Sequence, residues 1–164
     1  MLALREVTRE MNMSEEATEA AENGPQSPSI QINAQYIKDL SFESPRAPMV
    51  LQEQAQPAIE VSVDVKAHRL AEKSFEVVLS ASADAKTDSG QVFLVELTYA
   101  GVFTLDGVNE QQVAPILLVE CPRLLFPFAR AIIADATRDG GFPPLMIQPV
   151  DFARLFAENQ TASA

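Results

Sequence analysis

The side chains that most often carry out chemistry are few in this chain and lie far apart. The one histidine, His68, has no second histidine with which to share a metal ion, and we expect it on the surface in a turn. Residues 87–90 (TDSG) superficially resemble a serine-hydrolase signature, but His68 precedes them by a strand and no supporting motif is present. A serine nucleophile needs a clustered base and an orienting group, so a hairpin turn is the better interpretation.

The single cysteine, Cys121, cannot form a disulfide within the chain. A proline follows it and apolar residues surround it, so we expect a buried and inert thiol. There is also no glycine-rich loop of the kind that holds phosphate groups. The sequence therefore predicts no catalytic residue, no metal and no cofactor, and the protein is not expected to be an enzyme.

The composition limits the classes of partner that the protein is expected to bind. The 164 residues carry a formal charge of -11, which repels nucleic acid and anionic membranes at long range and favours a basic partner. Hydrophobic residues make up 47% of the chain, which fits one folded domain, and no apolar run is long enough to span a membrane. The lone cysteine and an N-terminal segment without an apolar centre indicate the cytoplasm.

Alternating apolar and polar residues predict four strands. The first, at 30–39, has one set of residues on each face: Ile30, Ile32, Ala34 and Tyr36 on one, and Gln31, Asn33, Gln35 and Asp39 on the other. Residues 59–65 and 75–83 alternate in the same way, and a tight turn at 86–90 leads into a strand at 91–105. This last strand has Val92 and Leu94 on its otherwise polar face, so we expect both faces to contact protein. The sheet is expected to be an antiparallel meander or Greek key.

Two other segments frame the sheet. Residues 41–57 contain Pro45, Pro48 and Pro57 and are expected to form a long crossover loop. Asn109 with Gln112 resembles a capping box that begins a long helix, which is expected to break at Cys121–Pro122, to kink at Pro127 and to end at the two glycines 140–141. A short last helix is expected after Asp151, which caps it.

The long helix has more apolar residues than one small sheet can cover: Ile116, Leu117, Val119, Leu124, Leu125, Phe128, Ile132 and Ile133. We therefore expect the chain to associate with copies of itself. The expected fold is α+β, with a four-stranded antiparallel sheet, a long kinked helix and a short C-terminal helix. Its domain is predicted at 30–157, between a disordered acidic tail at 1–29 and a flexible tail at 158–164.

Four segments, in this order and spacing, resemble the SecB family of protein-export chaperones: YIKDLSFESPRAP, FLVELTYAGVFTL, CPRLLFPFAR and GGFPPLMIQPVDFARLF. The resemblance extends from Ile30 to Phe156. It implies a homotetramer, built as a dimer of dimers, with long helices between eight-stranded sheets. It also implies a protein that binds unfolded precursor proteins, keeps them competent for export and delivers them to the SecA motor ATPase.

The resemblance also implies residue roles. The SecA-binding positions correspond to Asp39, Glu43, Leu94 and Glu96. Subunit association corresponds to Val95, Leu97 and Tyr99, and at the first of these a cysteine is common in the family. Surfaces that bind unfolded clients correspond to Phe42, Met49, Leu51, Phe142, Leu145 and Ile147. Weak contacts to several such surfaces strengthen one another, which suits a long unfolded chain better than a folded protein.

The residues alone leave other interpretations open. The carboxylates Asp39, Glu43 and Glu96 are also typical of a solvated surface, and the apolar loop residues are equally typical of a small core beneath a long loop. A carrier of small hydrophobic ligands is the alternative function, in which Phe42 and Phe142 close over one cavity. A hydrolase is poorly supported, because the sequence has no clustered triad.

Overall fold

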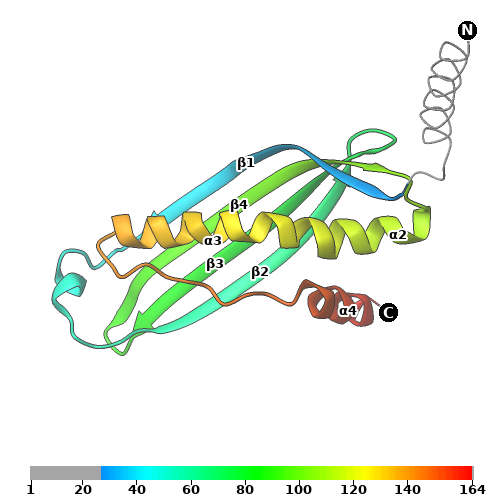
Figure 1. The fold of residues 1–164 in the computed structure, drawn as a ribbon. Helices are drawn as coiled ribbons and strands as arrows, with labels where there is room; N and C mark the ends of the chain where they lie inside the picture. The colour runs from blue at the N-terminus through cyan, green and yellow to red at the C-terminus, as the bar shows by residue number, and fades with distance from the viewer. Residues whose placement is uncertain (1–26, 164) are drawn as a thin grey trace, which may run out of the picture.

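Four strands pair antiparallel in the order β1-β4-β3-β2, in a computed structural model that describes residues 27–163 (Figure 1). The strands are β1 (Ser29–Glu43), β2 (Ala58–Arg69), β3 (Ser74–Thr87) and β4 (Gly90–Asp106). Hairpins join β2 to β3 and β3 to β4, while β1 lies beside β4. This strand arrangement is a Greek key and not a simple meander. Most of the tail predicted at 1–29 lies outside the described residues.

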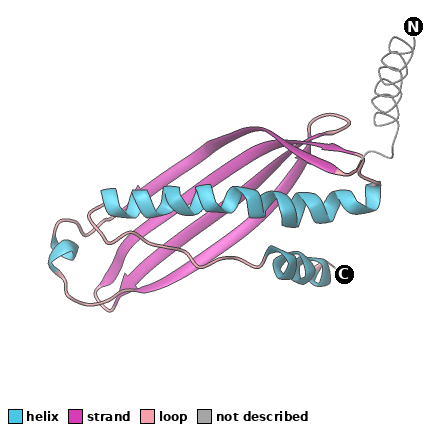
Figure 2. Cartoon of the chain, viewed as in Figure 1, coloured by secondary structure: helices cyan, strands magenta, loops and turns pink. Residues whose placement is uncertain are grey.

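The helices cover one face of this sheet, and the predicted α+β class is confirmed (Figure 2). The covered face holds the core, where Val77, Leu79 and Val95 have no exposed surface. Alternation predicted the faces of β2 and β3 correctly, because their pairing holds one register through the alternating runs. In β4 the prediction is correct from Phe93 onward. A register shift between Ala85 and Lys86 leaves Val92 without a partner in β3, and Val92, expected on the polar face, is buried together with Phe93. We call the covered face the inner face and the opposite one the outer face.

The faces predicted for β1 were wrong in part. Two β-bulges interrupt its pairing with β4, between Ile32 and Ala34 and between Ile37 and Asp39. Because each extra residue reverses the alternation, Ile32 pairs with inner-face Phe103, whereas Tyr36 pairs with outer-face Ala100. Ala34 and Tyr36 thus lie opposite to Ile30 and Ile32, and Gln35 lies on the inner face.

The segment between β1 and β2 is shorter than predicted. Residues 41–43 belong to β1, so the loop expected at 41–57 begins after Glu43, and we call residues 44–57 the crossover segment. One turn of 3₁₀-helix, η1 (Met49–Gln52), then forms within it, and the side chain of Val50 is buried. His68, expected in a turn, lies in β2 and pairs with Glu76 of β3.

The long helix is continuous, and the break predicted at Cys121–Pro122 is absent. It consists of α2 (Glu110–Pro115), a π-helical turn η2 (Ile116–Glu120) and α3 (Cys121–Asp139). The Asn109–Gln112 capping box is present as predicted. The Cys121 N–H donates to the Ile116 carbonyl, five residues back, so the wider turn keeps the backbone bonded next to Pro122, which lacks a donor.

Two glycines end α3 as predicted. Gly141 has a φ of 92°, and the Phe142 N–H donates to the Thr137 carbonyl at 3.1 Å, which completes a Schellman motif. The connecting loop, residues 142–151, then leads to α4 (Phe152–Ala162), which is capped by Asp151. The domain end predicted at 157 falls inside α4, which continues to Ala162.

Candidate functional site

The outer face carries an acidic patch, which we define as Asp39, Glu43, Leu94 and Glu96. Thr98 pairs with Asp39, and Glu43 pairs with Leu94, so the four residues lie on neighbouring strands on the same side of the sheet. The three carboxylates are exposed and Leu94 is half-buried. The structure therefore brings together the four residues predicted from the family resemblance.

A shallow hollow extends this acidic patch across the sheet. Asp39 and Glu96 line the hollow with small polar side chains of β2 and β3, among them Ser62 and Ser82, and with Asp64. The Ser41 hydroxyl lies 3.4 Å from the Glu96 carboxylate and donates to it. Asp64 was not predicted as a site residue, although the alternation of β2 places it on the polar face. The hollow is shallow, and the carboxylates of Asp39, Asp64 and Glu96 give it a negative charge.

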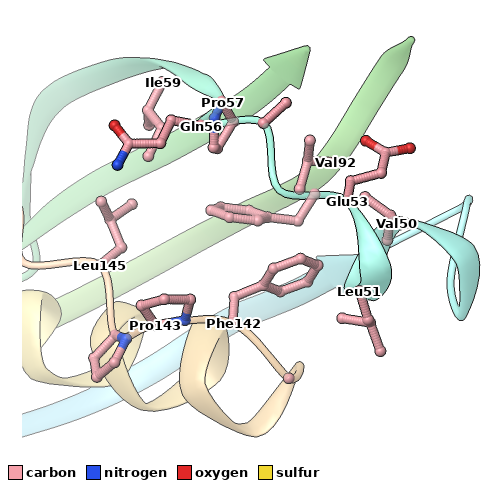
Figure 3. A pocket seen from close by; sticks show the side chains of 14 residues that line it. Val50, Leu51, Glu53, Gln56, Pro57, Ile59, Val92, Phe142, Pro143 and Leu145 are labelled. Carbon is pink, nitrogen blue, oxygen red and sulfur yellow. The ribbon is translucent and has the colours of Figure 1, made fainter.

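An apolar cavity of about 470 Å³ lies on the opposite side, between the crossover segment and the connecting loop (Figure 3). Its open shape and mainly apolar walls suit flexible apolar side chains. The residues that line it are Val50, Leu51, Glu53, Ala55, Gln56, Pro57, Ile59, Val92, Phe93, Gly141, Phe142, Pro143, Pro144 and Leu145.

Three of the six predicted client-binding residues, Leu51, Phe142 and Leu145, line this cavity. Phe42 packs behind it, with ring centroids 5.8 Å from Phe93 and 6.2 Å from Phe142. The other two lie outside the lining: Met49 is 67% exposed on η1, and Ile147 is only 5% exposed. The lining residues Ile59 and Phe93 were missed because the sequence alone placed them only in strands.

Close packing and hydrogen bonds hold the walls of the cavity. A β-carbon at Gly140 would lie 2.3 Å from the Phe42 ring, so glycine is required where α3 ends against this aromatic group. The buried Thr137 hydroxyl accepts a 2.9 Å hydrogen bond from the Leu145 N–H, which ties the connecting loop to α3. On the other wall, the Arg46 guanidinium binds the Glu53 carboxylate, and this hydrogen bond lowers the pKa of Glu53.

The three residues predicted for subunit association lie in the interior. Val95, Leu97 and Tyr99 are 0%, 2% and 7% exposed, beneath the chain's own helix. The Tyr99 hydroxyl donates to the Gln35 side chain at 3.2 Å, and its ring stacks on Phe128 at 6.5 Å. Phe128 itself is 50% exposed.

Next to Tyr99 lies an open apolar surface, which we define as Ile37, Leu40, Leu124 and Phe128. All four side chains are exposed. Ile37 and Leu40 pair with Tyr99 and Leu97 of β4, so they lie on the inner face at the sheet edge that the helix leaves uncovered. A patch of this kind is typical of a contact with another protein chain.

The residues considered first for chemistry have ordinary structural surroundings. Burial raises the pKa of the Cys121 thiol to about 12, which keeps it protonated. Ser89 lies in the turn between β3 and β4, as predicted. Within residues 27–163, no three histidine, cysteine or acidic side chains are grouped so that they could hold a metal ion, and no helix is long and apolar enough to cross a membrane.

An open apolar cavity on one side of a sheet and an acidic patch on the other are features of a protein that binds other polypeptides. The chain matches the family model described as "Preprotein translocase subunit SecB" over residues 23–163. It is also similar to the "Protein-export protein SecB" of two bacteria. Identity is 54% with that of Maricaulis maris, covering 85% of this chain and 81% of the relative, and 56% with that of Sinorhizobium medicae, covering 86% and 88%.

The chain belongs to the SecB family of protein-export chaperones. Its fold also resembles a solved SecB-like chaperone of Mycobacterium tuberculosis, in complex with a ChAD peptide from the HigA1 antitoxin. That match has a TM-score of 0.60 and 17% identity, and it covers 74% of this chain and 90% of the other. Family membership confirms the predicted chaperone function and decides against an enzyme and against the alternative of a ligand carrier.

Proposed function

We propose that this chaperone holds unfolded precursor proteins in the apolar cavity and presents its acidic patch to the SecA ATPase. The observation that carries the proposal is the position of the two sites on opposite faces of one sheet. Because the sheet separates them, a precursor and the motor do not compete for the same side chains. The proposed place of action is the cytoplasm, where precursors are made.

The acidic patch suits a basic partner surface. Its three carboxylates are exposed and lie beside Leu94, so charge steers a partner and the leucine gives it apolar area to bury. Among residues 27–163, the one side chain that donates a hydrogen bond to the Glu96 carboxylate is Ser41, and this neutral donor leaves the negative charge available.

We further propose that the chain works as a tetramer, a dimer of dimers. The open apolar surface supports this, because a second copy can cover Ile37, Leu40, Leu124 and Phe128. The buried Val95, Leu97 and Tyr99 then act indirectly, since they set the packing of α3 and the sheet beneath that surface. Several cavities in one particle bind one long precursor together, which raises its apparent affinity.

Two assays test the division of labour. The purified chain should slow the aggregation of a denatured protein without nucleotide, and Glu96→Lys should weaken binding to SecA while it leaves this activity unchanged. Glu72→Lys is the matched control, because the exposed Glu72 lies in the turn between β2 and β3. That turn is roughly 27 Å from Glu96 along the strands. Equal loss of both activities in Glu96→Lys would refute the assignment of SecA to the outer face.

A further inference from the structure

Arg46, in the crossover segment before η1, has an unusually complete set of partners. Its side chain is 26% exposed. Nε donates to the Gln91 carbonyl at 2.9 Å, and Nη2 lies 3.3 Å from the Thr87 hydroxyl oxygen. Both terminal nitrogens bind the Glu53 carboxylate. One planar guanidinium therefore connects three separate groups.

These partners join two parts of the chain that are distant in sequence. Thr87 and Gln91 flank the hairpin turn between β3 and β4, whereas Glu53 follows η1. The neighbouring Ser44 hydroxyl donates to the Val92 carbonyl at 3.0 Å, which fastens the same segment a second time. The crossover segment is thus held against the hairpin.

The position of η1 sets one wall of the apolar cavity. Val50 and Leu51 belong to η1 and line the cavity, and Glu53 lies at the same wall (Figure 3). A β-carbon built on Gly141 would lie 3.3 Å from Leu51, so η1 reaches close to the start of the connecting loop. One turn of helix without a side-chain cap is unstable alone, so tertiary contacts must hold it.

The geometry points to Arg46 as a positioning residue for client binding: it fixes η1 so that the apolar cavity is open before an unfolded chain arrives. Such preorganisation favours binding because the client does not have to order the wall. The guanidinium also neutralises Glu53, which would otherwise place a free charge at an apolar site. The inference rests on the proposed function and adds a residue to it.

Arg46→Met tests this role, because it keeps an apolar stem of similar length and removes all three sets of hydrogen bonds. We expect its affinity for reduced and alkylated lactalbumin to fall about tenfold, the equivalent of one net hydrogen bond. Hydrogen exchange at the Leu51 and Glu53 amides should become faster, since their partners lie within the crossover segment. Affinity for SecA should not change. Arg46→Lys should recover only part of the loss, because an ammonium cannot reach three acceptors at once.

Arg154→Met is the matched control, since it removes the same charge from an exposed pair with Glu158 on α4. It should bind client and SecA as the natural chain does. Unchanged client affinity in Arg46→Met would overturn the inference, and so would a parallel loss of client and SecA binding, which indicates general unfolding. If the natural chain fails to bind the alkylated protein, the proposed function fails instead.

Discussion

On the inner face of the sheet, Val77, Leu79 and Val95 have no exposed surface, whereas their outer-face neighbours include Ser80, Ser82 and exposed Glu96. The same strands make both faces, because successive side chains point to opposite sides. The inner face supplies the free energy of burial and the apolar cavity, while the outer face supplies charge. Under the proposed function, this arrangement separates the site that holds an apolar chain from the site that contacts a charged partner.

The two faces should differ most in how strongly a substitution changes the free energy of unfolding. Leu97→Ala, which removes a side chain only 2% exposed, should lower the free energy of unfolding by about 2–5 kcal/mol. Thr98→Ala, on the next residue and the outer face, should change it by no more than about 0.5 kcal/mol. Urea unfolding at one fixed protein concentration measures both. Similar losses would show that the outer face is also covered.

The edge of the inner face should decide assembly. Phe128→Glu places a carboxylate on the open apolar surface, where a partner subunit would have to bury it, so we expect a lower molar mass by light scattering. Met146→Glu is the control, because Met146 is 53% exposed in the connecting loop, close to the 50% of Phe128. A mass that stays unchanged in Phe128→Glu would exclude this surface from the subunit contact.

The apolar cavity should be specific for the client. Phe142→Ala removes one lining ring and should weaken binding of an unfolded protein by about tenfold. Its affinity for SecA should not change. Met146→Ala, in the same loop but outside the lining, should affect neither. Loss of SecA binding in Phe142→Ala would erase the distinction between the two faces.

The smallest expected effect concerns an ion pair on the outer face. Glu76 accepts hydrogen bonds from Lys38 at 2.8 Å and from the Tyr36 hydroxyl at 2.6 Å, and these contacts, that of Lys38 first, lower its pKa. Glu76→Gln should therefore cost less than about 1 kcal/mol of stability at neutral pH. Glu72→Gln, in the turn between β2 and β3, is the control and should lower the free energy of unfolding by less than Glu76→Gln does.

The sign of the pH dependence follows from the lowered pKa of Glu76. The charged form is favoured in the folded state, so its contribution is complete above the carboxyl pKa of the unfolded chain and is lost as pH falls through the folded pKa. The difference in free energy of unfolding between Glu76→Gln and the natural chain, measured by urea unfolding, should therefore disappear over that acidic range. A gap that is constant with pH would contradict the account.

Local signals in the sequence predicted much of this architecture. The Asn109 and Asp151 caps depend on residues three positions away, and the unbroken alternation of β2 gave its faces correctly. The prediction of the β1 faces was wrong in part, because alternation cannot reveal the bulges after Ile32 and Ile37. The prediction of a helix break at Pro122 was wrong, because a π-helical turn can also accommodate the backbone N–H that proline lacks.

The functional surfaces were predictable to different degrees. The family resemblance named the acidic patch, and pairing across two adjacent strands brings its residues together. The cavity was predicted only in part, because its walls come from three stretches that are distant in sequence, within 50–59, 92–93 and 141–145. The Arg46 contacts to Thr87 and Gln91 join residues more than forty positions apart, and no local pattern indicates such a contact.

The most direct test of the separation between the faces is the affinity of SecA for the chaperone, measured with and without a saturating unfolded protein. The account predicts similar affinity in both conditions and a ternary complex whose mass equals the sum of its three components. Displacement of the unfolded protein by SecA, with no ternary complex at any concentration, would contradict it.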